Sequence, residues 1–180
     1  MWDINKTIQL KAFARVDGAY LGLIWIASFA FFVMQYSNPI MGTVSMLVSF
    51  MSLYFIYKRI VKFRIDICND ELPFAKAYIY SLFMFFYAAL ILGVAQYIYF
   101  KFIDGGFILN TYRDIMSTPE FKEASKAYGM SANEMKEALN TLSQVRPVDI
   151  VLNIMSMNIF GSIFLSIPIA FMSRKNKTNN

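Results

Sequence analysis

The chain has 180 residues, of which 57% are hydrophobic and only 16% are charged. Soluble domains contain roughly 45–50% apolar and about 25% charged residues, so this composition excludes an ordinary water-soluble domain and favours a single membrane domain over residues 1–180. The formal net charge is +5, no histidine is present and Cys68 is the only cysteine; the chain therefore has neither an internal disulfide nor histidine-based catalysis or metal binding.

The first predicted element is a short amphipathic helix over residues 4–16. Its apolar residues recur four positions apart, at Ile4, Ile8, Ala12 and Val16. Three cations occupy other positions of the same segment. We expect this N-terminal helix to lie in the membrane interface before the chain turns into the first span.

Asp17 follows directly and has two interpretations. It could pair with Arg15 at the membrane boundary, where such a pair adds little stability. It could also act as the acid of a proton relay, since ionisable groups inside spans are usually functional. Its place at the edge of the first span, rather than the middle, favours the boundary interpretation.

Four apolar segments are predicted to cross the membrane as helices. They cover about residues 17–36, 40–57, 75–100 and 148–172. Each is long enough for the roughly 30 Å hydrocarbon core. A single apolar segment in lipid satisfies its own backbone hydrogen bonds only as a helix. The predicted fold class is therefore all-α, an integral membrane four-helix bundle.

Small residues at helical spacing predict where these spans pack against each other. The first span carries Ala14, Gly18 and Gly22, and the second carries Gly42, Ser45, Ser49 and Ser52. Such faces let helices approach closely in lipid. The alternative is a polar pathway lined by Ser45, Ser49, Asn153 and Asn158, which would need a cavity between the spans.

A basic run follows the second span, formed by Lys58, Arg59, Lys62 and Arg64. Lysine and arginine near short loops mark the cytoplasmic side, and both ends of the chain also carry cations. We therefore expect both termini to be cytoplasmic, in a bacterial inner membrane. The run should anchor the span and contact anionic lipid headgroups. No nucleic-acid-binding module accompanies it, so nucleic acid is not an expected partner.

The outer segment over residues 104–147 is predicted to hold two short amphipathic helices. Thr118 and Pro119 resemble an N-cap followed by a first-turn proline, and Gly129 is a natural stop. Ser131 and Glu134 fit a capping box that starts the second helix. The carboxylates at Glu120, Glu123, Glu134 and Glu137 lie among lysines and are expected to form solvated charge pairs rather than a metal site.

The stretch "DELPFAKAYIYSLFMFFYAALILGVAQYIYFKFIDGGFI", Asp70–Ile108, resembles the central signature of a Bacteroidetes membrane family catalogued as domain of unknown function forty-one ninety-nine. Phe74 and Ala77 resemble the start of that family's third span, and "YIYFKFID", Tyr97–Asp104, resembles its aromatic exit. The resemblance implies a four-span inner-membrane protein and no known catalytic residues.

These features predict a non-enzymatic accessory or interaction protein that binds another membrane protein or a second copy of itself. No catalytic, cofactor-binding or metal-binding residue is assigned. The alternative is a small transporter or channel subunit acting as an oligomer. A membrane enzyme is least favoured, because no catalytic motif is present and its only candidate residues are Asp17, Asp104 and Asp149.

Overall fold

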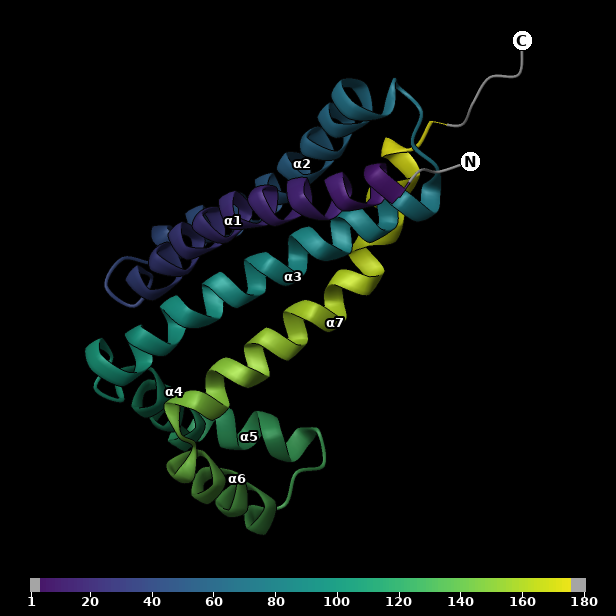
Figure 1. The fold of residues 1–180 in the computed structure, drawn as a ribbon. Helices are drawn as coiled ribbons and strands as arrows, with labels where there is room; N and C mark the ends of the chain where they lie inside the picture. The colour runs from purple at the N-terminus through teal and green to yellow at the C-terminus, as the bar shows by residue number, and fades with distance from the viewer. Residues whose placement is uncertain (1–3, 176–180) are drawn as a thin grey trace. The chain divides into compact units, whose positions relative to one another are not determined.

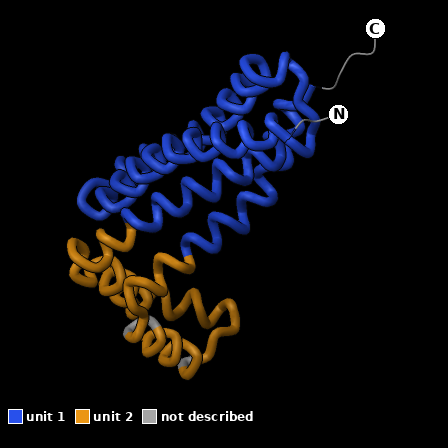
Figure 2. The backbone as a smooth tube through the Cα atoms, viewed as in Figure 1, with its two compact units in different colours: residues 1–95, 154–180 blue, residues 96–153 orange. Residues whose placement is uncertain are grey.

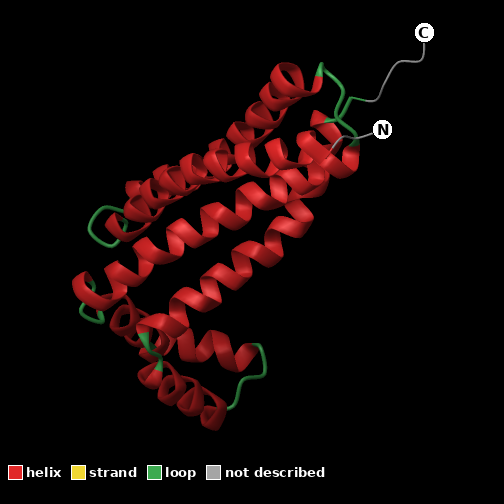
Figure 3. Ribbon diagram, in the orientation of Figure 1, coloured by secondary structure: helices red, strands yellow, loops and turns green. Residues whose placement is uncertain are grey.

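The computed structural model describes residues 4–175, without the side chains of Ala132, Leu142 and Ser143. The described residues form helices throughout and contain no β-strand (Figures 1 and 3). The elements are α1 (Ile4–Met34), α2 (Ile40–Cys68), α3 (Phe74–Ile98), the π-helix η1 (Tyr99–Ile103), α4 (Phe107–Ser117), α5 (Pro119–Ala127), α6 (Ala132–Gln144) and α7 (Pro147–Ser173). The predicted all-α class is confirmed.

Four of these helices are long and apolar enough to cross a membrane. They are Ile4–Met34, Ile40–Cys68, Phe74–Ile103 and Pro147–Ser173, with 27 to 31 residues each. At a rise of about 1.5 Å per residue, each exceeds the roughly 30 Å of hydrocarbon that a span must cross. The four predicted spans therefore correspond to four observed helices.

The chain divides into two compact units (Figure 2). The first unit holds the chain up to Ala95 and from Ile154 onward, and the second holds Gln96–Asn153. A buried apolar core runs through the first unit and draws residues from α1, α2, α3 and α7, among them Leu21, Ile56, Met84 and Ile169.

The N-terminal residues do not form a separate helix. Residues 4–16 continue into the first span without a break, as one helix from Ile4 to Met34. Its buried face follows Leu10, Ala14, Asp17 and Leu21, spaced by four, three and four residues, while Ile4, Ile8 and Val16 are exposed. A strict four-residue spacing drifts around a helix of 3.6 residues per turn, so the predicted stripe and the observed buried face diverge.

Helix α2 is longer than the predicted span, which ended at Tyr57. The basic run continues the helix as far as Cys68, because lysine, arginine and isoleucine sustain a helix after the apolar stretch has ended. Asn69 and Asp70 then adopt positive φ angles of 52° and 61°. Asparagine and aspartate tolerate this left-handed conformation better than most residues, and it turns the chain toward α3.

The outer segment holds three helices rather than the predicted two. The additional helix, α4, begins after Gly105 and Gly106, whose φ angles are +56° and +85°. The Asp104 carboxylate accepts a hydrogen bond from the Ile108 amide at 3.2 Å and so satisfies a free donor of the first turn. Two adjacent glycines are more typical of a turn or loop than of a helix start, so the sequence pattern did not predict α4.

The predicted starts of α5 and α6 are confirmed. The Thr118 hydroxyl accepts a hydrogen bond from the Phe121 amide at 3.3 Å, with Pro119 in the first turn. Ser131 and Glu134 form the reciprocal capping box, with bonds of 2.7 and 3.2 Å. Gly129 takes a φ of +87° after α5, as a helix stop requires.

Candidate functional site

The most distinctive polar feature of the four long helices is a contact among Asp17 of α1, Arg59 of α2 and Tyr80 of α3. Asp17 Oδ1 accepts hydrogen bonds from Arg59 Nε, at 2.7 Å, and from Arg59 Nη2. Asp17 Oδ2 accepts a hydrogen bond from the Tyr80 hydroxyl at 2.5 Å. Both oxygens of the carboxylate are therefore bonded, each to a different helix.

This contact is almost closed to solvent. Asp17 is 1% exposed and Tyr80 is fully buried, whereas 28% of the Arg59 side chain remains accessible. The Phe63 ring lies 4.8 Å from the Tyr80 ring, and the Phe13 ring lies 5.6 Å from that of Phe63. A buried carboxylate needs such partners, because an unpaired charge in an apolar surrounding is very costly.

A cavity of about 20 Å³ lies beside this contact. Asp17, Arg59 and Tyr80 line it together with Lys62 and Asp66. A cavity of about 10–15 Å³ is the minimum for one water molecule, so there is room for roughly one. This volume is far too small for an organic substrate, which would need roughly 300 Å³ or more. The arrangement fastens three helices together.

The predicted partner of Asp17 is wrong. Arg15 was the expected neighbour, but the bonded cation is Arg59, from the basic run and 42 residues away. Two of the four cations in that run face other protein groups, because Arg64 also contacts Asp70. Lys58 and Lys62 remain exposed. A solitary acid beside an apolar span signals that a cation is needed, but it does not identify which one.

The serines of the second span bond to α1. The Ser28 hydroxyl lies 3.1 Å from the Ser45 hydroxyl and 2.9 Å from the Ser49 hydroxyl. The Ser45 hydroxyl also donates to the Ser28 carbonyl at 2.8 Å, and Trp25 Nε1 donates to the Ser52 hydroxyl at 3.2 Å. These hydroxyls therefore act as links between helices, in line with the packing interpretation of this small-residue face.

The predicted small-residue face of α1 lies against α3. A Cβ atom added to Gly18 would fall 2.8 Å from the Met84 carbonyl oxygen and from Tyr87 Cβ. One added to Gly22 would fall 2.9 Å from Ile91 Cβ. Two glycines one turn apart thus let α1 and α3 approach each other more closely than any larger residue would permit.

A second ionic cluster joins the connection between α2 and α3 to the end of α7. The Asp70 carboxylate contacts Arg64 Nε at 2.9 Å and also binds the Lys175 ammonium group. Arg64 Nη1 donates to the Ser173 carbonyl at 2.8 Å. The Leu72 and Lys175 backbones exchange two hydrogen bonds, of 2.8 and 2.9 Å. We call this group of contacts the loop–tail clip.

The loop–tail clip should weaken in acid. The hydrogen bond from Lys175, followed by the charge of Lys175 and then that of Arg64, holds the pKa of Asp70 below its ordinary value. The stabilisation is therefore complete above about pH 4, the ordinary range of an aspartate, and is lost as the pH falls through the lowered pKa. Hydrogen-exchange protection factors of the Leu72 and Lys175 amides should fall in that window.

Asp70→Asn should lower the same protection factors at neutral pH, where the ion pairs of the wild-type loop–tail clip are intact. Glu71→Gln is the matched control, because Glu71 is an exposed acid in the same connection. If both variants reduced protection equally, the effect would come from the net charge of the loop and the clip assignment would be wrong.

The other candidate acids have local roles. Asp104 caps α4, as described above, and Asp149 binds Arg146 at 2.8 and 2.9 Å in the first turn of α7. The Glu134 carboxylate accepts a bond from the Ser131 amide, and this bond lowers its pKa. Among the described residues, no three histidine, cysteine, aspartate or glutamate side chains are close enough together to hold a metal ion.

Four membrane-compatible helices, joined by polar contacts between them, define the class of an uncharacterised integral membrane protein. The chain belongs to the family described as Protein of unknown function (DUF4199), whose sequence profile matches residues 17–175. The match begins at Asp17 and includes Arg59 and Tyr80. No curated protein and no solved structure matches the sequence.

Proposed function

We propose that this chain is a non-enzymatic accessory protein of the bacterial inner membrane, acting by binding another membrane protein or a second copy of itself. The observation that carries the proposal is the contact of Asp17, Arg59 and Tyr80. Its carboxylate is fully bonded and 1% exposed, so it is not available to a substrate or a transported proton. A rigid helical scaffold is a better match for this chemistry than a reaction centre.

The outward face of α7 supports binding to a partner. Asn153 is exposed and Asn158 is half-buried, and neither amide has a hydrogen-bond partner among the described residues. Side-chain amides in a span usually bond to another helix, because lipid offers no partner. Phe160 and Phe164, 63% and 60% exposed, follow Asn153 by seven and eleven residues and so share its face of α7, where they would surround a contact of Asn153 with apolar surface. Asn158 lies on a different face of the helix.

The pairing of Ser45 and Ser49 with Ser28 counts against the alternative of a transporter or channel subunit. The hydroxyls that would have lined a polar pathway with Asn153 and Asn158 instead bond to α1. A channel would therefore have to break these bonds or use other groups. Flux through liposomes that contain the protein tests this alternative. Flux that persisted after replacement of Asn153 and Asn158 would contradict both the accessory role and the polar pathway lined by these two residues.

Photo-cross-linking in native membranes tests the interaction directly. A photoreactive residue replacing Phe160 on α7 should yield one discrete protein adduct, whose mass tells a second copy from another protein. The matched control is Phe50 on α2, which is 59% exposed and should yield lipid adducts alone. Equal protein adducts from both positions, or none from Phe160, would contradict the assignment.

The orientation is part of the same proposal. The loop–tail clip joins the basic loop to the basic C-terminal end, so these two cationic segments belong on one side of a membrane. Positive segments are retained in the cytoplasm. In a Cys68→Ser background, an impermeant thiol reagent should label Ser37→Cys from outside and leave Lys11→Cys unlabelled. The reverse pattern would invert the topology.

A further inference from the structure

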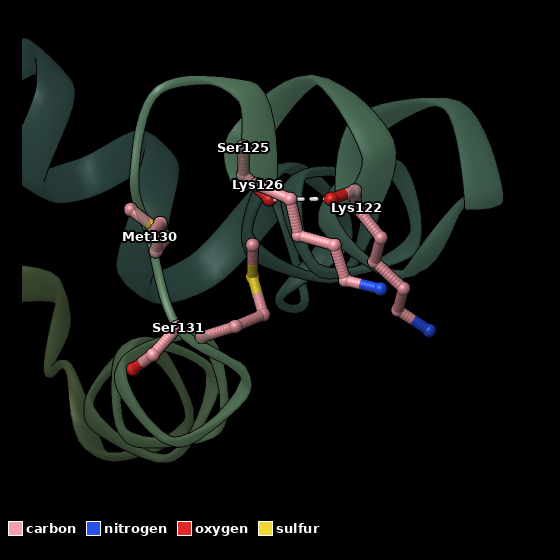
Figure 4. A pocket seen from close by; sticks show the side chains of 6 residues that line it. Lys122, Ser125, Lys126, Met130 and Ser131 are labelled. Atoms are coloured by element: carbon pink, nitrogen blue, oxygen red, sulfur yellow. Dashed lines mark hydrogen bonds between the residues drawn. The ribbon is translucent and has the colours of Figure 1, made fainter.

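The connection between α5 and α6 encloses a pocket of about 200 Å³ (Figure 4). It is lined by Lys122, Ser125, Lys126, Met130, Ser131 and Met135. All six belong to the outer segment, and the proposed function described above does not use this pocket. Its volume is below the roughly 300–1,000 Å³ of pockets for drug-sized ligands, so it suits a small group.

Two ammonium groups give this pocket a positive charge. Lys122 and Lys126 are one helical turn apart on α5, and Figure 4 shows their amines on the same side. Like charges at this spacing repel each other and destabilise a helix, so a bound anion would relieve the repulsion. Neither amine forms a salt bridge with a carboxylate in residues 4–175. Glu134, the nearest acid in sequence to the lining residues of α6, is bonded to the Ser131 amide instead.

The opposite wall of the pocket is apolar. Met135 is 7% exposed and Met130 is 39% exposed, and both thioether side chains line the cavity. Methionine adapts its shape to irregular apolar groups. Neither serine hydroxyl competes for the amines: Ser131 accepts a bond from the Glu134 amide and points away from the two lysines in Figure 4, and Ser125 donates its proton to the Lys122 carbonyl at 3.0 Å.

We propose that this pocket binds the phosphate-bearing headgroup of an anionic amphiphile. Lys122 and Lys126 hold the phosphate, and Met130 and Met135 contact the carbon atoms next to it. The outer segment joins two membrane-compatible helices, so lipid headgroups are the nearest source of such a ligand. A soluble phosphate compound is the other source of the same chemistry.

The site can be tested with the full chain in lipid nanodiscs, by measuring how far a bound lipid protects the lysine amines from acylation. Discs of phosphatidylcholine are compared with discs that also contain phosphatidylglycerol, and acylation of each lysine is followed by peptide mass spectrometry. Phosphatidylglycerol should slow labelling of Lys122 and Lys126 by about threefold when the lipid is at about twice its dissociation constant. Lys136, an exposed lysine of α6 outside the pocket, should be unaffected.

Inorganic phosphate added to phosphatidylcholine discs separates the two sources. Weaker protection than with phosphatidylglycerol assigns the ligand to the lipid, and equal protection assigns it to a soluble phosphate; both support a phosphate pocket. Equal slowing at Lys122, Lys126 and Lys136 would indicate diffuse attraction to the membrane and overturn the proposal.

Substitutions in the pocket, read out by lipid retention and by amine protection, test the site further. Lys122→Gln with Lys126→Gln should lose most of the phosphatidylglycerol retained through detergent purification, whereas Lys136→Gln should keep it. Met130→Trp should fill the pocket without changing its charge and abolish protection of both lysines. Retention by the double variant, or full protection in Met130→Trp, would overturn the site.

Discussion

Replacement of Arg59 by leucine should destabilise the protein much more than replacement of Asp17 by asparagine. Arg59→Leu leaves a buried carboxylate without its cation, and loss of one partner from a buried ion pair costs about 3–5 kcal/mol. Asp17→Asn keeps an acceptor for Tyr80, and the partly exposed Arg59 can extend its guanidinium to the membrane surface. We expect about 1–2 kcal/mol in that case.

The free energy of unfolding is measured by titrating sodium dodecyl sulfate into mixed micelles and following the helical circular dichroism. Lys58→Leu is the matched control, because Lys58 is an exposed cation adjacent to Arg59 and should have little effect. The double variant Asp17→Asn with Arg59→Leu should be more stable than Arg59→Leu alone, since the unpaired charge has gone. Strictly additive losses would show that the two side chains do not interact.

The helical architecture could be predicted because its signals are local. Continuous apolar runs identified the four long helices, and the residues at Thr118, Pro119, Ser131 and Glu134 marked helix starts within a few positions. Lengths were less predictable. Hydropathy identifies only the apolar part of α2. The helix continues through the basic run to Cys68, because charged side chains do not interrupt the backbone hydrogen bonds of a helix.

For the polar contacts, the sequence shows that a buried charge needs a partner but not which residue that partner is. Asp17 needed a cation, yet its partners are 42 and 63 residues away, and nothing in their spacing distinguishes Arg59 from Lys58 or Lys62. The same limit applies to Asp70, which binds Lys175 across 105 residues. Such pairings depend on the rotation of each helix about its axis, and that rotation is set by the packing of several helices together.

Replacement of Gly18 by alanine should be the most damaging of three equivalent glycine substitutions. The added Cβ atom would lie 2.8 Å from the Met84 carbonyl oxygen and from Tyr87 Cβ. A backbone carbonyl cannot rotate away as a side chain can, so α1 and α3 must separate. Overpacking of this kind typically costs about 1–3 kcal/mol, and the separation would also lengthen the bond between Asp17 and Tyr80.

Gly42→Ala and Gly161→Ala supply controls with the same change in composition. At Gly42 the new Cβ would meet Gln35 Oε1 at 2.7 Å, the flexible end of a side chain that can move aside. At Gly161 it would meet nothing within 4 Å, so the helix should gain about 0.5–1 kcal/mol from reduced backbone freedom. Unfolding in sodium dodecyl sulfate should therefore rank Gly161→Ala as most stable, then Gly42→Ala, then Gly18→Ala. A Gly18→Ala protein as stable as Gly161→Ala would mean that α1 and α3 do not touch at this point, and the contact among Asp17, Arg59 and Tyr80 would lose its geometric basis.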